Sequence, residues 1–185
     1  MGHDYTDEDL MLMYRDGDAS AFEILYHRHK GQIYRFILRR CGNTGTAEEL
    51  YQDVWLKLIL ARERYEVSAR FTTYLYRIAN NHVIDHFRRT SSGCVISGGE
   101  DAEQLPAPAR DQPEQRAQLG EQARLLLDAV ASLPDEQQQV FLLKEEAGMS
   151  IREIAETLGV NGETVKSRLR YAVKKLRTVM GEING

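Results

Sequence analysis

The fold of this chain is decided by residues 149–177, which read "MSIREIAETLGVNGETVKSRLRYAVKKLR". Apolar residues recur at helical spacing and predict one face of a first helix, made of Ile151, Ile154, Ala155 and Leu158. A second apolar stripe follows at Val165, Leu169, Ala172 and Leu176. Between them, Gly159 can take the positive φ that a tight turn needs, and Asn161 is a good N-cap. Two short amphipathic helices joined by such a turn predict a helix-turn-helix.

The second of these helices is cationic, although the whole chain has a formal net charge of -4. Between Thr164 and Arg177 there are basic residues but no acid. A helical projection places a polar arc opposite the apolar stripe, made of Lys166, Ser167, Arg170, Tyr171 and Lys174, with Glu163 at its N-terminal end. Arg168 and Lys175 flank this arc. Such a face predicts binding in the major groove of duplex DNA, with basic groups on phosphates and Ser, Tyr and Arg at base edges. Most charge runs are solvated faces, but a single-signed run on this helix favours DNA.

Composition excludes several classes of protein. The 185 residues are 42% hydrophobic and 28% charged, as in ordinary globular proteins. No apolar run approaches the roughly 18–20 residues that span a bilayer, which predicts no membrane insertion. The N-terminus "MGHDYTDEDL" is polar and acidic, unlike a secretory signal. Cys41 and Cys94 form no metal-binding or redox pair motif, so we expect a cytoplasmic protein without a metal or other cofactor.

The distribution of residue types along the chain predicts an all-α protein of two small domains. Residues 1–89 and 114–185 are rich in helix formers with apolar residues at helical spacing, whereas residues 90–113 are rich in Gly, Ser, Pro and Ala. The latter segment is also acidic and too poor in apolar residues to bury itself. We therefore expect a flexible acidic linker between two helical domains, of which the second contains the helix-turn-helix.

A second candidate nucleic-acid segment lies in the first domain, where residues 69–89 read "ARFTTYLYRIANNHVIDHFRR". On a helix, one polar face carries Arg77, Asn81 and Arg88, and aromatic residues gather at the N-terminal end at Phe71, Tyr74 and Tyr76. Interleaved aromatic and basic residues suit unstacked single-stranded bases, which need a ring to stack on and a cation for the phosphate. A packed aromatic core explains the same residues equally well.

The same segment resembles the promoter-melting segment of bacterial sigma factors of the extracytoplasmic-function (ECF) group of the sigma-70 family, whose pattern is roughly W-L-Y-R-I-A-x-N-x-x-I-D-x-x-R-R. This chain has "YLYRIANNHVIDHFRR", with Tyr74 in the Trp position. Residues 16–43 resemble the first conserved helix of the family, and "AEELYQDVWLKLIL" at 47–60 resembles its A-E-[DE]-L-x-Q-[DE]-x-[FW] helix. Residues 132–177 resemble its promoter-reading domain. Four motifs in the family order make the resemblance specific.

The resemblance implies a non-enzymatic transcription initiation factor that binds core RNA polymerase and directs it to promoters. The C-terminal domain would read the upstream (−35) element, and the N-terminal domain would melt the downstream (−10) element. Carried over to matching positions, contacts with the β′ clamp helices fall on Glu49, Gln52 and Asp53. Contacts with the separated strands fall on Tyr74, Arg77, Asn80, Asn81 and Arg88. It also implies contact with the β flap, a linker that threads toward the polymerase active-site channel, and an anti-sigma factor as regulator.

The chain departs from the family pattern at two places. Tyr171 to Val173 stand where the family often has Arg-Ala-Arg, so the upstream promoter sequence that this chain reads can differ from that of the family. His82 stands where an aliphatic residue is usual.

Two rival interpretations are open. A two-domain repressor or activator would use the same helix-turn-helix but leaves the first domain without a role. A zinc enzyme is suggested by the spacing of His82 and His86, but Val83 replaces the catalytic Glu of the HExxH motif.

Overall fold

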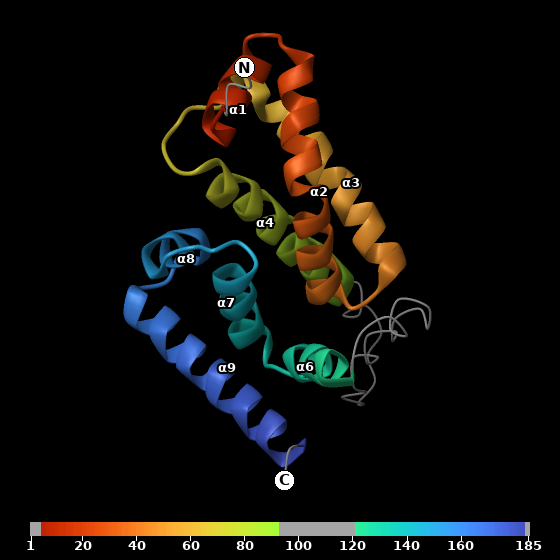
Figure 1. Ribbon diagram of the computed structural model, residues 1–185, viewed down its shortest axis with the longest axis vertical. Coiled ribbons are helices and arrows are strands. Elements are labelled where there is room, and N and C mark those ends of the chain that lie inside the picture. Colours follow the sequence, from red (N-terminus) through yellow and green to blue (C-terminus); the bar gives the residue numbers. More distant parts are fainter. Residues whose placement is uncertain (1–4, 93–120, 184–185) are drawn as a thin grey trace. The chain divides into compact units, whose positions relative to one another are not determined.

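The computed structural model describes residues 5–92 and 121–183, and it divides the chain into two compact units, Met1–Ala107 and Pro108–Gly185 (Figure 1). The described residues form helices joined by turns, with no strand among them. The predicted all-α fold is thereby confirmed. None of the described helices is both long and apolar enough to cross a membrane.

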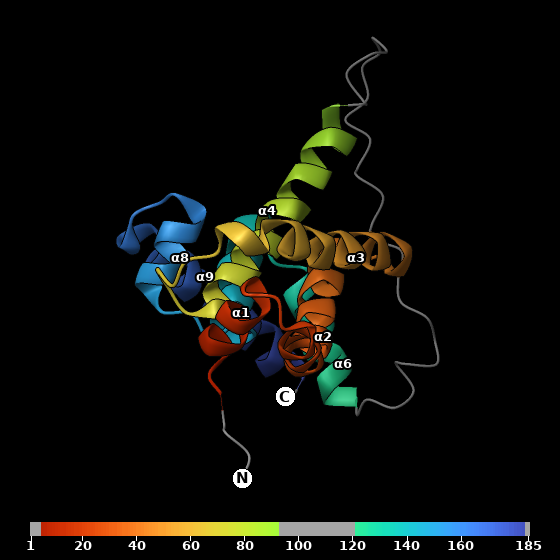
Figure 2. The ribbon, with the colours of Figure 1, turned by 90° about the horizontal axis from the view of Figure 1, so that it is seen from above.

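The N-terminal unit is built around a long central helix, α2 (Ala19–Cys41). Helices α1 (Asp7–Arg15), α3 (Thr44–Ala61) and α4 (Phe71–Ser92) all pack against α2, and a 3₁₀ turn, η1 (Arg62–Arg64), follows α3. Their common core includes fully buried Leu25, Phe36, Leu50, Leu58, Phe71 and Tyr76. The last turns of α4 extend past α3 (Figure 2), and residues 87–90 are accordingly exposed.

Two helix starts differ from the capping-box patterns in the sequence. The capping-box motifs "SAFE" (Ser20 and Glu23) and "TAEE" (Thr46 and Glu49) predict N-caps at Ser20 and Thr46, but Asp18 caps α2 and Asn43 caps α3. Each of these side chains accepts a hydrogen bond from a backbone N–H in the first turn, at 2.9 Å in both cases. The predictions were wrong because a good capping side chain lies two or three residues earlier and starts the helix first.

An ion-pair cluster ties the first helix, α1, to α2. Asp7 accepts from His29 Nε2 at 2.7 Å and from Arg28 Nη1 at 2.8 Å. The hydrogen bond with His29 lowers the pKa of Asp7, against the opposing effect of partial burial, and Arg28 lowers it further. The carboxylate is therefore stabilised in its charged form by folding.

We expect Asp7→Asn to lower the free energy of unfolding of the N-terminal unit by about 1–2 kcal/mol at pH 7, because two charge-assisted hydrogen bonds are lost. Since folding lowers this pKa, the contribution is present above the unfolded value of 3.8 and is lost as the pH falls through the lower folded value. Urea unfolding followed by the fluorescence of Trp55, the chain's single tryptophan, measures it. Asp16→Asn, at an exposed ion pair, is the control and should cost under about 0.5 kcal/mol. Equal midpoints for the two variants at pH 7 would contradict the assignment.

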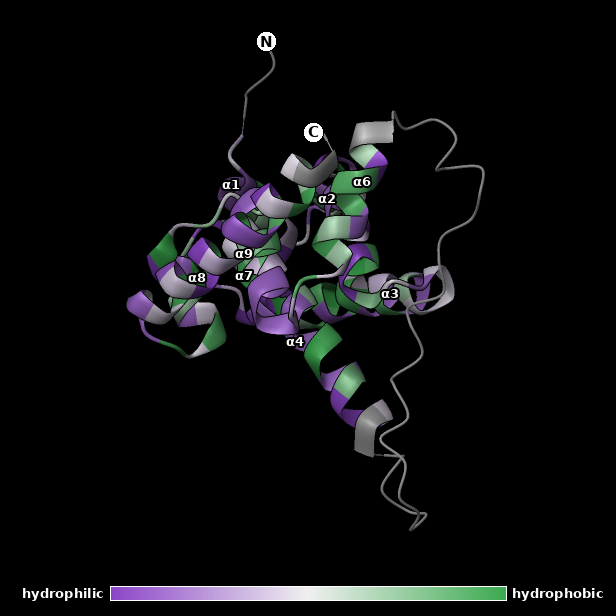
Figure 3. Cartoon of the chain, turned by 90° about the horizontal axis from the view of Figure 1, so that it is seen from below, coloured by the Kyte–Doolittle hydropathy of each residue, from purple (hydrophilic) through white to green (hydrophobic). Residues whose placement is uncertain are grey.

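The C-terminal unit consists of α6 (Glu121–Ala131), α7 (Asp135–Glu145), α8 (Ile151–Leu158) and α9 (Gly162–Ile183). Helix α9 packs against the other three. The predicted helix-turn-helix is confirmed as α8 and α9, and the motif "SIRE" forms a capping box between Ser150 and Glu153. Gly159 has φ 66°, and Asn161 Oδ1 accepts from Thr164 N at 2.8 Å. Hydrophilic and hydrophobic residues alternate around these helices (Figure 3), as amphipathic packing requires.

The predicted linker lies mostly outside the described residues. Helix α4 continues through Ser92, so its first three residues are helical. The rest of the linker, Cys94 and residues 114–120 lie beyond the described ranges. Cys41, at the end of α2, is a free thiol, and its burial raises its pKa to about 11.

Candidate nucleic-acid interface

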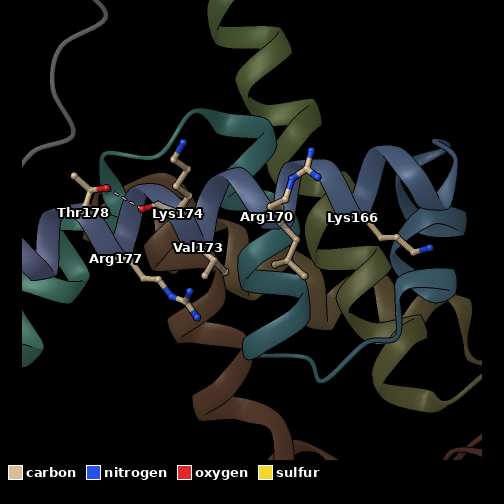
Figure 4. A pocket seen from close by; sticks show the side chains of 7 residues that line it. Lys166, Arg170, Val173, Lys174, Arg177 and Thr178 are labelled. Carbon is tan, nitrogen blue, oxygen red and sulfur yellow. Dashed lines mark hydrogen bonds between the residues drawn. The ribbon is translucent and has the colours of Figure 1, made fainter.

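The C-terminal part of the candidate interface is the polar face of α9. Val165, Ala172 and Leu176 are buried in the core of the unit, as their spacing predicts, whereas Leu169 of the same stripe is only partly buried. The opposite side exposes Lys166, Arg170, Tyr171 and Lys174, with Ser167 partly exposed. Arg170 and Lys174 project to the same side of the helix in Figure 4, and Arg177 projects to the other. Cations thus flank a shallow groove whose apolar lining is Leu169 and Val173.

The cations of α9 differ in how far they are already paired. Lys166 binds Glu163 at 2.8 Å, and this contact lowers the pKa of Glu163. Arg168 turns toward α7 and pairs with Glu136 at 2.8 Å, with only 21% of its side chain exposed. Lys175 donates to the Ser132 carbonyl at 2.9 Å. The two residues that flank the predicted arc therefore brace α9 against neighbouring segments of the unit.

Arg170 and Lys174 make no ion pair with any residue that the structure describes. The guanidinium of Arg170 lies over the ring of Tyr171, 5.3 Å from its centroid. This contact holds a planar donor group at an exposed position without neutralising its charge. Free positive charge on the polar face is thus concentrated at the middle and the C-terminal part of the arc.

The N-terminal part of the candidate interface is the polar face of α4. Arg77, Asn81 and Arg88 are exposed on it, and Tyr74 is partly exposed. Arg77 lies over the ring of Tyr74, 5.9 Å from its centroid, and the Tyr74 ring packs edge-on against Tyr65 at 5.2 Å. Burial raises the pKa of Tyr74 further above its ordinary value, which favours the neutral phenol. A supported aromatic ring beside a cation is suited to stacking on a base.

Other residues of that segment belong to the core. Phe71 and Tyr76 are fully buried, so of the three clustered aromatic residues only Tyr74 can meet a ligand. Asn80 is also fully buried. Its neighbour Asn81 points outward because successive helical residues are turned by about 100°. The structure thus encloses the Asn80 side chain in the core of the unit, away from the exposed face of α4.

A third polar surface lies on α3, where the predicted residues Glu49, Gln52 and Asp53 lie at least partly exposed on one side. Leu50, Val54 and Leu58 are buried on the other, as their spacing predicts. Leu56 and Leu60 were not predicted, yet they are 52% and 75% exposed on the same helix. The stretch "VWLKLIL" contains more apolar residues than a one-sided helix needs, which is the signal that could have identified them.

A contact that the sequence did not predict joins this surface to α4. Nearly buried His82 of α4 lies 3.0 Å from Asp53 Oδ2 through Nε2, and 2.7 Å from Lys57 Nζ through Nδ1. Both nitrogens of the ring are therefore engaged within the protein, which leaves neither for a zinc ion. These residues line a groove between α3 and α4, together with Leu56, Leu60, Asp85, Arg88 and Arg89.

Comparisons with known proteins match both units. The family model for sigma-70 region 2 matches residues 25–93, and the model for sigma-70, region 4 matches residues 123–176. RNA polymerase sigma factor CarQ of Myxococcus xanthus is 33% identical over 174 residues, which cover 94% of this chain and 97% of CarQ. ECF RNA polymerase sigma factor SigL of Mycobacterium tuberculosis (strain ATCC 25618 / H37Rv) is 31% identical, over 90% of this chain and 92% of SigL.

A solved structure agrees in fold. The sigma factor RpoE, in its complex with the anti-sigma factor NepR from Bartonella quintana, superposes with a TM-score of 0.71. The match covers 86% of this chain and 96% of RpoE, at 21% sequence identity. At this identity the likeness shows a shared fold.

Proposed function

Because the chain belongs to the extracytoplasmic-function group of the sigma-70 family of RNA polymerase sigma factors, we propose that it binds core RNA polymerase and directs it to specific promoters. It does so as a non-enzymatic initiation factor in the cytoplasm, where polymerase and chromosome meet. The observation that carries the proposal is that one chain presents two cationic helix faces, α9 in the region 4 unit and α4 in the region 2 unit. A repressor or activator would need only the first.

Upstream promoter recognition is assigned to the polar face of α9. Arg170, Ser167 and Tyr171 are close enough in sequence to address neighbouring base edges from one groove. Lys166 and Lys174 lie at the two ends of the arc, where phosphates run past a helix in the major groove. Glu163 orients Lys166 through their ion pair, and Arg168 can reach a phosphate only by exchanging Glu136 for it.

Promoter melting is assigned to the polar face of α4. Tyr74 offers a ring for stacking, while Asn81 offers both donors and an acceptor to an unpaired base. Arg77 and Arg88 supply positive charge for the phosphates of the separated strand. Asn80 is placed behind this face because it is buried.

Binding of core polymerase is assigned to the surface of α3 that holds Glu49, Gln52 and Asp53. The two carboxylates suit a basic partner surface, and exposed Leu56 and Leu60 add apolar area that a partner can bury. Contact of the C-terminal unit with the β flap and passage of the linker through the active-site channel complete the proposed assembly.

Reversing the charge of the patch, with Glu49→Lys and Asp53→Lys together, should weaken association with core polymerase about tenfold or more. Equilibrium binding of labelled chain to core polymerase measures this. A matched control reverses Glu23 and Glu66, which are exposed elsewhere on the same unit. Trp55 fluorescence checks that both variants fold. Unchanged affinity in the folded double variant would remove the assignment of this patch.

The proposed function itself is tested by run-off transcription with purified core polymerase. We expect the chain to confer initiation at its own class of promoters, with an open bubble that core polymerase alone does not form. A protein that binds promoter DNA but gives neither stable association with core nor initiation at any promoter is instead a repressor or activator.

Control by an anti-sigma factor is part of the proposal. The solved relative RpoE is complexed with the anti-sigma factor NepR, and this chain shares its fold. Exposed apolar residues on α3 and an apolar-lined groove on α9 provide surfaces that such a partner can cover in each unit. An inhibitor that covers both would block polymerase and promoter together.

A further inference from the structure

His82 occupies an unusual position between two opposite charges of α3. Its side chain is 5% exposed, while the carboxylate of Asp53 that it contacts is 47% exposed. Asp53 and Lys57 are four residues apart and so lie on the same side of α3. They make no direct ion pair in the described structure, and each instead contacts one nitrogen of the imidazole.

The two contacts define the role of each ring nitrogen. Lys57 carries only donors, so Nδ1 must accept from it, and the carboxylate of Asp53 only accepts, so Nε2 must donate to it. The neutral ring with its proton on Nε2 satisfies both contacts at once. The ring thus holds Oδ2 of Asp53 at 3.0 Å and keeps the ammonium group of Lys57 on its far side.

An aliphatic side chain at position 82 would fill the space without performing this task. Asp53 and Lys57 would then be free to form the direct ion pair that their spacing favours. In that state the carboxylate is neutralised by a neighbour and is less available to a partner. The imidazole therefore acts as a spacer that keeps the negative charge of Asp53 directed outward.

We propose that His82 is a positioning residue for the binding of core polymerase, acting through Asp53. The proposal rests on the proposed function, because it presumes that the α3 surface receives the polymerase. It adds a residue of the melting helix, α4, to the determinants of polymerase affinity. It also predicts that glutamine, which carries one donor and one acceptor on its terminal amide, can replace the histidine.

The test is a double-mutant cycle on the full chain, measured as the dissociation constant for core polymerase. His82→Leu should weaken binding about threefold to tenfold, and His82→Gln should restore most of the lost affinity. In an Asp53→Asn background, His82→Leu should have little further effect, since the carboxylate on which it acts is absent. Trp55 fluorescence during urea unfolding confirms that each variant is folded under the binding conditions.

The outcomes separate this proposal from the proposed function. Binding of the wild-type chain to core polymerase supports the function whatever the variants do, and its failure overturns both. Wild-type affinity in folded His82→Leu shows that His82 only fills space. An effect of His82→Leu that persists in full in the Asp53→Asn background, or that His82→Gln does not relieve, shows that it does not act through Asp53.

Discussion

Replacing Arg170 by alanine should cost roughly 1–3 kcal/mol of affinity for the preferred upstream element and flatten discrimination at one or two base pairs. Arg170 lies in the middle of the exposed arc of α9, and its guanidinium rests on the ring of Tyr171. A planar group with several donors can bind a base edge through two hydrogen bonds, and the aromatic support reduces the conformational freedom lost on binding. Its loss is therefore expected to depend on the base that it contacts.

Lys174→Ala provides the matched control, because Lys174 lies one turn further along the same face. Its loss should weaken binding to all DNA sequences about equally, and should reduce the slope of log affinity against log salt concentration by about one unit. The measurement compares binding of the polymerase-associated chain to single-base variants of the upstream element at two salt concentrations. If Arg170→Ala also lowers affinity uniformly and the base preferences survive, Arg170 is a phosphate contact, and reading rests on Ser167, Tyr171 and Glu163.

Asn81→Ala should slow promoter opening about tenfold to a hundredfold while leaving the initial closed complex nearly unchanged. Asn81 is exposed on α4, one turn from Arg77, and its proposed contact is with a base that has left the duplex. In the open state, removing the Asn81 side chain leaves the hydrogen-bonding edge of that base without a partner, which costs roughly 1–3 kcal/mol. In the closed complex the base is still paired within the duplex, so its edge is not available to Asn81.

Permanganate footprinting on a linear promoter follows the opening step over time. A template that is already mismatched across the downstream element is the control, because it needs no opening and should largely restore initiation by Asn81→Ala. Opening at the wild-type rate on the fully paired template would show that Asn81 does not capture a base.

Much of the fold could be predicted because periodicity reports burial directly. The stripe through Val165 and Leu176 specified which side of α9 meets the core, and the structure buries both residues. Gly159 was predictable because a positive φ suits few other residues. The starts of α2 and α3 were not, since Asp18 and Asn43 compete with later residues for the same backbone donors.

The candidate site was less predictable, because a helical projection shows on which side of a helix a side chain lies but not which residues of other helices it contacts. Arg168 and Arg170 are both cations of one helix, yet only the structure shows that Glu136 of α7 pairs with the first. Asn80 belongs to a family motif, but its burial depends on how α4 packs in the unit. The contact of His82 with Asp53 joins residues 29 positions apart in sequence, which no local pattern reveals.

The partial burial of Cys41 at the end of α2 has a practical consequence for experiments with attached dyes. Burial raises the pKa of Cys41 to about 11, so the thiolate form, with which maleimides and peroxide react, is scarce at pH 7. We expect Cys41 to be spared by brief labelling near neutral pH. Replacing Cys94 alone should then give a background in which a cysteine introduced on α4 or α9 takes up a single fluorophore. With one such cysteine on each helix, a donor and an acceptor dye would report through energy transfer how the two units move from the free chain to the promoter complex.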